Sequence, residues 1–181
     1  MTEIKWKLAG TCHKFGDNQA HDNGLMPFKF VTDRVYDPEI LKEQFCVDAR
    51  PDLRARIKPG DIIVAGKNFG KGKPHVQGYI AMRALGIGMV CESMPFLPYR
   101  AAVGVGLMFL TDCVGVTDLV EDGHQIAVDF LTGEFANQTT GISKRFDPLP
   151  EGLRDMVALG GSKGVLSKWW QEQKAAEAQA A

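Results

Sequence analysis

The segment from residue 62 to residue 91 restricts the fold of this chain more than any other part of the sequence. Two short apolar runs, residues 62–66 and 87–91, are each bounded by turn residues, which is typical of strands buried in a parallel sheet. Residues 76–85 between them have helical spacing, and Gly86 is placed to end that helix. Because a strand–helix–strand crossover has one strongly preferred hand, the segment predicts an α/β fold.

The other apolar patterns extend this segment into a central, mostly parallel sheet flanked by helices. Residues 125–131 alternate apolar and polar side chains before Thr132-Gly133, which predicts a C-terminal hairpin. From about residue 175 the tail lacks an apolar pattern, so we expect it to be frayed. The remaining expected elements are strands over residues 4–12 and 107–110 and helices over residues 38–45, 97–103, 149–159 and 165–174.

Length and charge narrow the class of protein. The 181 residues fit a single domain over residues 1–181, with enough chain to bury a sizeable core. With 21 Lys and Arg against 22 Asp and Glu, the formal net charge is −1, which argues against nucleic-acid binding. The chain has no apolar run of about 18 residues and no signal-like N-terminus, so we expect a cytoplasmic protein without membrane contact.

The cysteines do not form a recognisable ligand set. Because the chain has no export signal, we expect reduced and mostly buried thiols. No three of them have iron–sulfur ligand spacing, so we expect this chain to bind no metal and no cofactor of its own. The four cysteines are Cys12, Cys46, Cys91 and Cys113.

The glycine-rich loop, residues 66–74, joins the first buried strand to the following helix. Glycines let a backbone approach a ligand closely, and the amides that open a helix favour an anion. The glycine spacing matches neither a phosphate-cradling loop nor a dinucleotide fingerprint. The density of positive charge favours a carboxylate or phosphate site, while a tight turn with solvated lysines is the alternative. Up to four cationic groups lie within nine residues: Lys67, Lys71, Lys73 and His75.

The polar loop over residues 13–24 also contains side chains that are able to bind a metal. Without a third ligand at recognisable spacing, we favour solvated turn residues over a metal site. Asp17, Asn18 and Asn23 are expected to form turns and caps through bonds from side chain to backbone. The metal-ligating types in the loop are His13, Asp17, His21 and Asp22.

Five segments of the chain form a recognisable series of motifs. They are Gly-Asp-Asn-Gln-Ala-His-Asp at 16–22, Met-Pro-Phe-Lys-Phe at 26–30, Gly-Lys-Asn-Phe-Gly-Lys-Gly at 66–72, Glu-Ser-Met-Pro-Phe-Leu-Pro-Tyr-Arg at 92–100 and Gly-Val-Gly-Leu at 104–107. Together these motifs resemble the small subunit of isopropylmalate dehydratase, the swivelling domain of the aconitase superfamily. The resemblance runs from about residue 8 to residue 170, with the motifs in the family's order.

The resemblance implies a swivelling β/β/α domain, like domain 4 of aconitase, that works against a separate large subunit. In the family, the large subunit holds a [4Fe–4S] cluster through three cysteines, and the small subunit closes over the substrate. The family reaction dehydrates and rehydrates a hydroxy di- or tricarboxylic acid, with iron as Lewis acid and a base that removes a carbon-bound proton. The resemblance therefore implies a hydro-lyase subunit that is inactive without its large subunit and forms a possible homo-oligomer when isolated.

The chain departs from the family directly after the glycine-rich loop. The family reads Ser-Ser-Arg-Glu-His, where the first serine is the base and the arginine holds a substrate carboxylate, whereas residues 73–77 here are Lys-Pro-His-Val-Gln. Lys73 and His75 are therefore the candidate bases. For Lys73 we expect a dry pocket and the neighbouring lysines to lower its pKa, which would allow it to act as a base. The alternative is a non-catalytic ligand-binding or regulatory subunit that has lost the serine base.

Other residues are candidates for substrate contact. The resemblance places Asp22 and Lys29 at the entrance to the cleft, and His21 stands where the family has threonine. Arg100, on the helix expected after the second buried strand, is either a surface charge or a second carboxylate clamp. Asn68 and Lys71 of the glycine-rich loop are the other candidates for contact with a substrate carboxylate.

Overall fold

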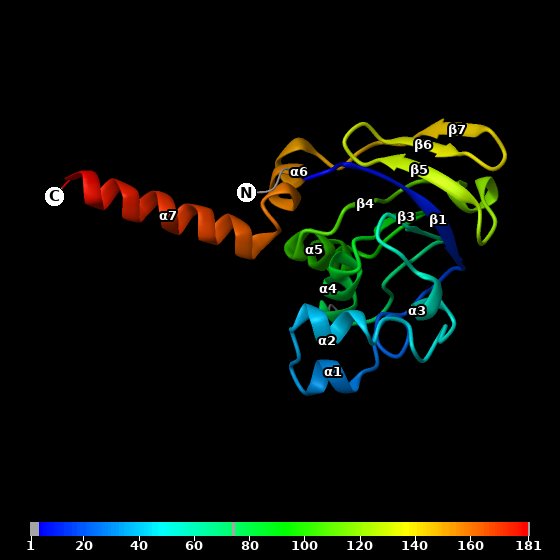
Figure 1. The fold of residues 1–181 in the computed structure, drawn as a ribbon, viewed down its shortest axis with the longest axis horizontal. Helices are drawn as coiled ribbons and strands as arrows, with labels where there is room; N and C mark the ends of the chain where they lie inside the picture. Colours follow the sequence, from blue (N-terminus) through cyan, green and yellow to red (C-terminus); the bar gives the residue numbers. More distant parts are fainter. Residues whose placement is uncertain (1–3, 74, 181) are drawn as a thin grey trace.

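The computed structural model describes residues 4–73 and 75–180. Its sheet has seven strands in the order β4-β3-β2-β1-β5-β6-β7, so the first strand of the sequence lies in the middle (Figure 1). The strands are β1 (Lys7–Phe15), β2 (Ile62–Ala65), β3 (Gly88–Cys91), β4 (Phe109–Leu110), β5 (Gln125–Asp129), β6 (Glu134–Asn137) and β7 (Ile142–Arg145).

The sheet has a parallel half and an antiparallel half that meet at β1. The strands β1, β2, β3 and β4 pair in parallel, with Cys12 opposite Ile62. On its other edge β1 pairs antiparallel with β5, which continues into β6 and β7. The expected α/β class and the hairpin around Thr132-Gly133 are confirmed, but the hairpin extends the main sheet. We did not expect β7, because all four of its residues are exposed and carry no alternating pattern.

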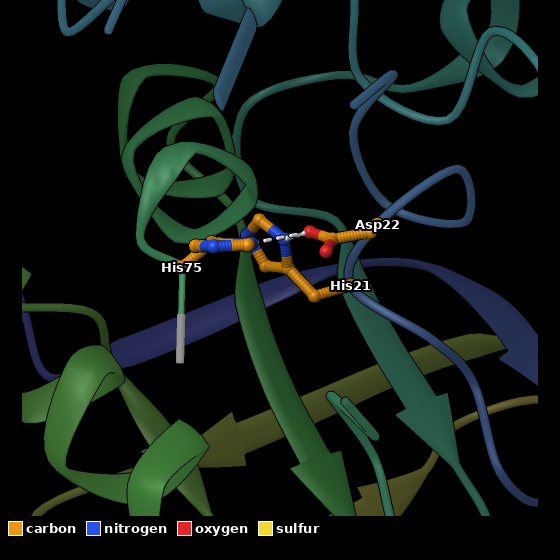
Figure 2. Close-up of side chains that lie close together, drawn as sticks. All are labelled: His21, Asp22 and His75. Carbon is orange, nitrogen blue, oxygen red and sulfur yellow. Dashed lines mark hydrogen bonds and ion pairs between the residues drawn. The ribbon is translucent and has the colours of Figure 1, made fainter. Parts of the chain in front are cut away.

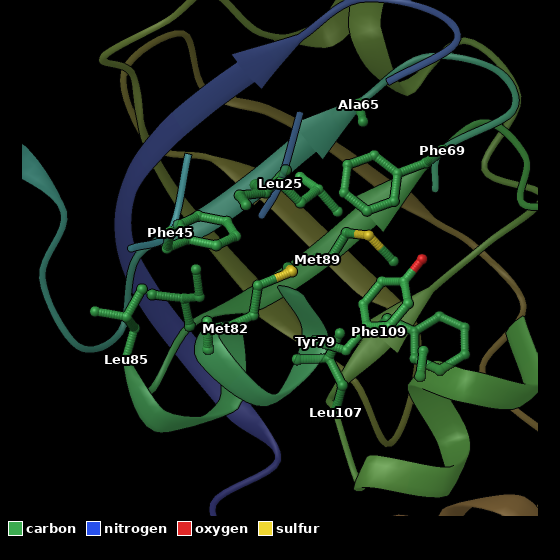
Figure 3. Packing of buried hydrophobic residues seen from close by; sticks show 14 of the residues in the cluster. Leu25, Phe45, Ala65, Phe69, Tyr79, Met82, Leu85, Met89, Leu107 and Phe109 are labelled. Carbon is green, nitrogen blue, oxygen red and sulfur yellow. The ribbon is translucent and has the colours of Figure 1, made fainter. Parts of the chain in front are cut away.

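Helices and apolar residues bury both faces of the parallel strands. Ile63 and Ala65 face one apolar cluster, which α4 and α5 cover (Figure 3), whereas Ile62 and Val64 face a second cluster. Burial on both faces explains why β2 is a continuous apolar run. The helices are α1 (Lys29–Thr32), α2 (Pro38–Lys42), α3 (Leu53–Arg56), α4 (Gln77–Ala84), α5 (Phe96–Val105), α6 (Glu151–Ala158), α7 (Ser162–Ala180) and the 3₁₀ helix η1 (Val116–Leu119).

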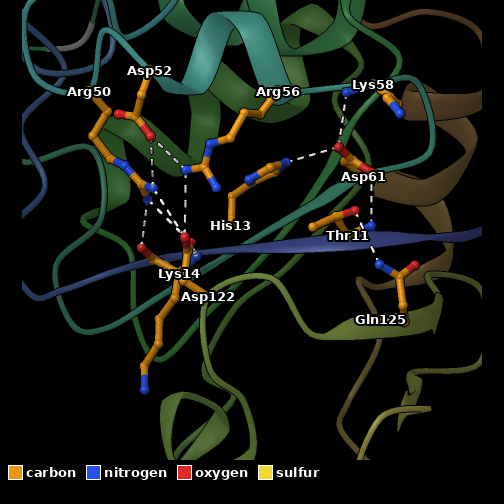
Figure 4. Close-up of polar contacts among 10 residues, drawn as sticks. All are labelled: Thr11, His13, Lys14, Arg50, Asp52, Arg56, Lys58, Asp61, Asp122 and Gln125. Carbon is orange, nitrogen blue, oxygen red and sulfur yellow. Dashed lines mark hydrogen bonds and ion pairs between the residues drawn. The ribbon is translucent and has the colours of Figure 1, made fainter.

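A buried carboxylate fixes the turn that leads into β2. Asp61 accepts hydrogen bonds from the backbone N–H groups of Thr11 and Lys58, at 2.8 and 2.9 Å, and pairs with His13 Nε2 at 2.9 Å (Figure 4). Gly10 leaves the necessary room, because a Cβ atom there would lie 2.7 Å from Asp61 Oδ1. Asp61 therefore aligns the start of β2 with β1, and the glycine-rich loop begins at the other end of β2.

The last helix, α7, projects away from the rest of the chain (Figure 1). It is longer than the expected helix over residues 165–174 and continues past residue 175, where we expected a frayed tail. Its second half is rich in alanine, glutamate and glutamine, which favour helix without tertiary contacts. Residue 181 lies outside the described residues. Among the helices that the structure describes, none is sufficiently long and apolar to cross a bilayer.

Candidate functional site

The polar loop after β1 and the glycine-rich loop after β2 lie against each other. The sequence predicts both loops but not their pairing, which follows from the parallel register of β1 and β2. Because both strands end at the same edge of the sheet, their loops leave it side by side. Four backbone hydrogen bonds join the loops: Asn18 N–H to Lys67 O (2.7 Å), Gly70 N–H and Lys71 N–H to Gln19 O (2.8 and 3.1 Å), and His21 N–H to Lys71 O (3.2 Å).

Side chains reinforce this pairing. Asp17 Oδ1 accepts the Lys67 N–H at 2.7 Å, and Asn68 Nδ2 donates to Asn18 Oδ1 at 2.8 Å. Asn23 Oδ1 accepts the Phe28 N–H at 3.0 Å. The expectation that Asp17 and Asn23 bind backbone groups is thus confirmed, although Asp17 bonds to the neighbouring loop. The Asn68 amide has a structural role here, and its contact with a substrate stays a prediction.

Gly70 allows the glycine-rich loop to pass over a buried tyrosine. Its φ is +79°, and a Cβ atom there would lie 2.1 Å from the Tyr79 hydroxyl oxygen. That hydroxyl group is buried and has no hydrogen-bond partner among the described residues. Burial raises the pKa of Tyr79, so its hydroxyl group stays protonated under the loop.

A cluster of one carboxylate and two imidazoles lies where the two loops meet α4 (Figure 2). Asp22 Oδ1 is 2.7 Å from His75 Nδ1 and 3.0 Å from His21 Nδ1. Both rings therefore approach the same carboxylate oxygen, and their centroids lie 5.9 Å apart. All three residues are candidates from the sequence, which does not predict that they form one cluster.

His21 is a buried helix cap instead of the solvated turn residue that we expected. Its side chain is 1% exposed, and Nε2 accepts the Gly78 N–H at 2.9 Å in the first turn of α4. A nitrogen that accepts a hydrogen bond carries no proton, so the neutral ring is protonated at Nδ1. Burial lowers the pKa of His21, which keeps the ring neutral. His21 thus donates from Nδ1 to Asp22.

Asp22 remains a carboxylate in this setting. Partial burial, the largest single influence, raises the pKa of Asp22, but the hydrogen bonds from His75 and His21 outweigh burial and lower it. An ionised carboxylate only accepts hydrogen bonds. The nitrogen of His75 that faces Asp22 must therefore carry a proton, as the facing nitrogen of His21 does.

His75 consequently has a free base nitrogen. Its Nδ1–H donates to Asp22, so in the neutral ring the lone pair is on Nε2. No described residue forms a hydrogen bond with Nε2, and the side chain is 23% exposed. The centres of the Phe28 ring and the His75 imidazole lie 5.9 Å apart, so Phe28 forms an apolar wall beside the imidazole. An imidazole that a carboxylate orients through Nδ1 is suited to remove a proton through Nε2.

The same three residues have atoms close enough to hold a metal ion, because one ligand atom from each lies within 4.8 Å of the others. The hydrogen bonds favour a proton network instead. If His21 Nδ1 ligated a metal, its Nε2 would carry the proton and face the Gly78 N–H, donor against donor. The cap on α4 therefore needs a lone pair on Nε2, the nitrogen that metal binding at Nδ1 would leave protonated.

Lys71 and Lys73 contact this cluster through their backbone carbonyls, which accept the His21 and His75 N–H groups. Among the described residues, no side chain of the remaining candidates forms a hydrogen bond with the cluster. Lys73 is exposed, as are Lys67 and Lys71, so the dry pocket that we expected around Lys73 is absent. Residues 71–73 are all exposed, which explains the difference. Pro74, between the two candidate bases, lies outside the described residues.

Arg100 and Lys29 both contact aromatic rings. The Arg100 guanidinium lies 5.6 Å from the centre of the Phe96 ring, at the edge of a groove of about 430 Å³ that Val76 also lines. Lys29 Nζ lies 4.9 Å from the centre of the Phe30 ring. Arg100 is thus a surface residue near the start of α4, and no described contact joins it to the glycine-rich loop.

The cysteines do not fit an iron–sulfur cluster. All four are fully buried, Cys46 and Cys91 in one apolar cluster and Cys12 and Cys113 in the other. Burial raises the pKa of Cys46 and of Cys91 to about 12 in each case, whereas a cluster needs thiolates. The expectation that Cys91 and Cys113 are core residues is confirmed.

Comparison with known proteins identifies the family. No family model matches the chain. The chain is 36% identical over 169 residues to the isopropylmalate/citramalate isomerase small subunit of Methanocaldococcus jannaschii, covering 92% of this chain and 98% of that protein. It is 34% identical to 3-isopropylmalate dehydratase small subunit 2 of Archaeoglobus fulgidus, covering 90% and 96%. The chain belongs to the 3-isopropylmalate dehydratase small-subunit family.

The structural comparison agrees with this assignment. A crystal structure of 3-isopropylmalate dehydratase from Methanocaldococcus jannaschii superposes with a TM-score of 0.82 at 28% identity, covering 93% of this chain and 98% of that one. The family resemblance and the α/β swivelling fold are therefore confirmed. Membership of the 3-isopropylmalate dehydratase small-subunit family also confirms the expected hydro-lyase function and does not favour a non-catalytic subunit.

Proposed function

We propose that this chain, as one domain over residues 1–181, is the small subunit of a two-subunit hydro-lyase that isomerises a hydroxy di- or tricarboxylic acid. Its partner is a large subunit that holds a [4Fe–4S] cluster, and the complex is cytoplasmic. The relatives are named isopropylmalate/citramalate isomerase and 3-isopropylmalate dehydratase subunits, which supports malate derivatives as the substrate class. The observation that carries the proposal is the free Nε2 atom of His75, which Asp22 holds two residues after the position of the family's base serine.

His75 is the base of the proposed reaction. Its Nε2 takes the carbon-bound proton, the electron pair left behind forms a carbon–carbon double bond, and the hydroxyl group leaves as hydroxide. When hydroxide adds back at the carbon that lost the proton, the imidazolium returns its proton to the carbon that lost the hydroxyl group. Asp22 stabilises the imidazolium through its hydrogen bond with Nδ1. The cluster of the large subunit supplies a Lewis acid that activates the leaving hydroxyl group.

The cationic groups of the glycine-rich loop bind the carboxylates of the substrate. Lys71 and Lys73 are exposed on this loop and are able to reach a ligand above it. Exposed lysines act as mobile point charges, which suits the binding of carboxylates but not the abstraction of a carbon-bound proton. Lys29 beside Phe28, Asn68 and Arg100 are the further candidates for substrate contact.

The proposal is tested by anaerobic capture from the native host with this chain as bait. We expect a larger, cysteine-bearing protein with the visible absorbance of an iron–sulfur cluster. The purified complex should then hydrate the unsaturated acid derived from isopropylmalate or citramalate, while the isolated small subunit should not. If the complex forms, holds its cluster and turns over neither acid nor related hydroxy acids, the proposed function is wrong. A chain that captures no larger partner would also contradict it.

A further inference from the structure

The buried imidazole of His21 has no direct role in the proposed reaction, yet it connects α4 to the base. Its Nε2 accepts the Gly78 N–H of α4, and its Nδ1 lies 3.0 Å from Asp22 Oδ1. We propose that His21 is a positioning residue: it fixes Asp22, and through Asp22 it selects the tautomer of His75 that keeps Nε2 free. The inference rests on the proposed function for its kinetic test but not for its spectroscopic test.

The start of α4 fixes the tautomer of His21. The Gly78 N–H belongs to the first turn of α4, where a backbone donor lacks a partner within the helix. His21 Nε2 supplies this partner at 2.9 Å, so the proton of the neutral ring must be on Nδ1. The helix cap therefore determines which nitrogen of His21 is able to donate.

His21 and His75 share one carboxylate oxygen of Asp22. Both Nδ1–H groups donate to Oδ1, from His21 at 3.0 Å and from His75 at 2.7 Å. The carboxylate is held from two directions, and one of its donors is buried and cannot rotate away. Without His21, the Asp22 side chain, which is 25% exposed, would be free to rotate away from His75. The neutral ring of His75 would then exchange between its two tautomers.

Contacts of its backbone and its ring hold His21 rigidly in place. Its backbone N–H bonds to Lys71 O, and its carbonyl accepts from the N–H groups of Leu25 and Met26. On one side the ring lies 5.5 Å from the centre of the Tyr79 ring, and on the other it nearly touches Gly78. A Cβ atom on Gly78 would lie 3.0 Å from His21 Nε2. The ring therefore has little freedom to adopt another orientation.

Nuclear magnetic resonance tests the tautomers on the isolated chain. The four histidines are labelled with ¹⁵N, and two-bond ¹⁵N–¹H couplings are measured at about pH 8, where neutral imidazoles dominate. We expect His21 and His75 both to carry the proton on Nδ1. A proton on Nε2 of His21 would overturn the inference. Loss of the Nδ1 proton from both rings on addition of Zn²⁺ would also overturn it, because the cluster would then be a metal site.

Two substitutions at position 21 separate positioning from packing. In His21→Asn the side-chain amide is able to replace Nδ1–H as the donor to Asp22, whereas in His21→Gln the amide oxygen replaces Nε2 as the helix cap. We expect His75 to keep its tautomer in His21→Asn and to become a mixture in His21→Gln. We expect Asp22→Asn to give the same mixture of His75 tautomers, so this variant replaces His21→Gln if the His21→Gln chain fails to fold. His124→Asn, in a remote turn, is the matched control and should leave His75 unchanged.

The reconstituted complex provides the kinetic readout. We expect His21→Gln to lower kcat about 10-fold with KM within about twofold, and His21→Asn to stay within about threefold of wild type. Equal losses in both variants, or an unchanged His75 tautomer in His21→Gln and Asp22→Asn, would overturn the inference. If the wild-type complex shows no turnover, the proposed function fails, whereas the spectra still decide whether His21 positions His75.

Discussion

The Nδ1 atom of His75 lies 2.7 Å from the Oδ1 atom of Asp22, although 53 residues separate them in the sequence. This contact joins the loop after β1 to the start of α4 and leaves the opposite nitrogen of His75 free. A carboxylate that binds one nitrogen of an imidazole sets its orientation and stabilises its protonated form. The proposal that this chain supplies the base of a hydro-lyase depends on this pair.

Lys73→Ala tests the other candidate base. Because Lys73 is exposed, we expect kcat to stay within about twofold and KM to rise about threefold, as for the loss of one exposed charge. The measurement is steady-state hydration by the reconstituted complex, with Lys168→Ala on α7 as the matched lysine control. A fall in kcat of about 100-fold with little change in KM would identify Lys73 as the base.

Asp22 gives stability a defined pH dependence. Its pKa in the folded chain is lowered, so its contribution is fully present above the unfolded pKa of about 4 and is lost as pH falls through the folded pKa. Asp22→Asn should lower the free energy of unfolding by about 1–2 kcal/mol at neutral pH. Urea titrations of both chains should converge as pH falls below about 4. A difference that is independent of pH would contradict this prediction.

Gly70→Ala should disturb the glycine-rich loop through Tyr79. The new Cβ atom would lie 2.1 Å from the tyrosine hydroxyl oxygen, so we expect a loss of about 2 kcal/mol in unfolding free energy. Gly72→Ala is the matched control, because Gly72 also has positive φ but has no atom within 4 Å of the added Cβ. Tyr79→Phe should recover part of the loss, since it removes the contacting oxygen. Equal losses at both glycines would show that backbone strain alone is responsible.

Asp61→Ala should destabilise the chain far more than Asp122→Ala. Asp61 is buried and its loss leaves His13 and two backbone donors without their acceptor, which we expect to cost about 3–5 kcal/mol. Asp122 binds Arg50 and the Lys14 N–H near the surface, so its removal should cost about 1 kcal/mol (Figure 4). Chemical denaturation of both variants provides the comparison, and similar losses would contradict it.

The sequence predicts the elements whose cause is local. The helix expected from residue 38 begins there as α2, because Asp37 Oδ1 accepts the Glu39 N–H at 2.9 Å and Pro38 occupies the first helical position. The buried run of β2 and the helix that follows are also placed correctly, because spacing and turn residues define them. Such signals are complete within a few neighbouring residues.

The arrangement of the candidate site depends on contacts between distant residues. His21 was expected to be solvated, since nothing near it in the sequence indicates that Gly78, 57 residues later, needs its Nε2. The exposure of Lys73 was missed for the same reason, because burial depends on what lies above a loop. The family resemblance makes Asp22 and His75 candidates, and the departure at residues 73–77 predicts a different base, but only the fold connects His75 to Asp22.

His75→Asn in the reconstituted complex tests the central claim most directly. The asparagine amide is able to keep the donor to Asp22 while it removes the base nitrogen. We predict that kcat falls at least about 100-fold with the complex and its cluster intact, and that His124→Asn has no such effect. Turnover of His75→Asn at the wild-type rate would contradict the claim that this chain supplies its base through His75.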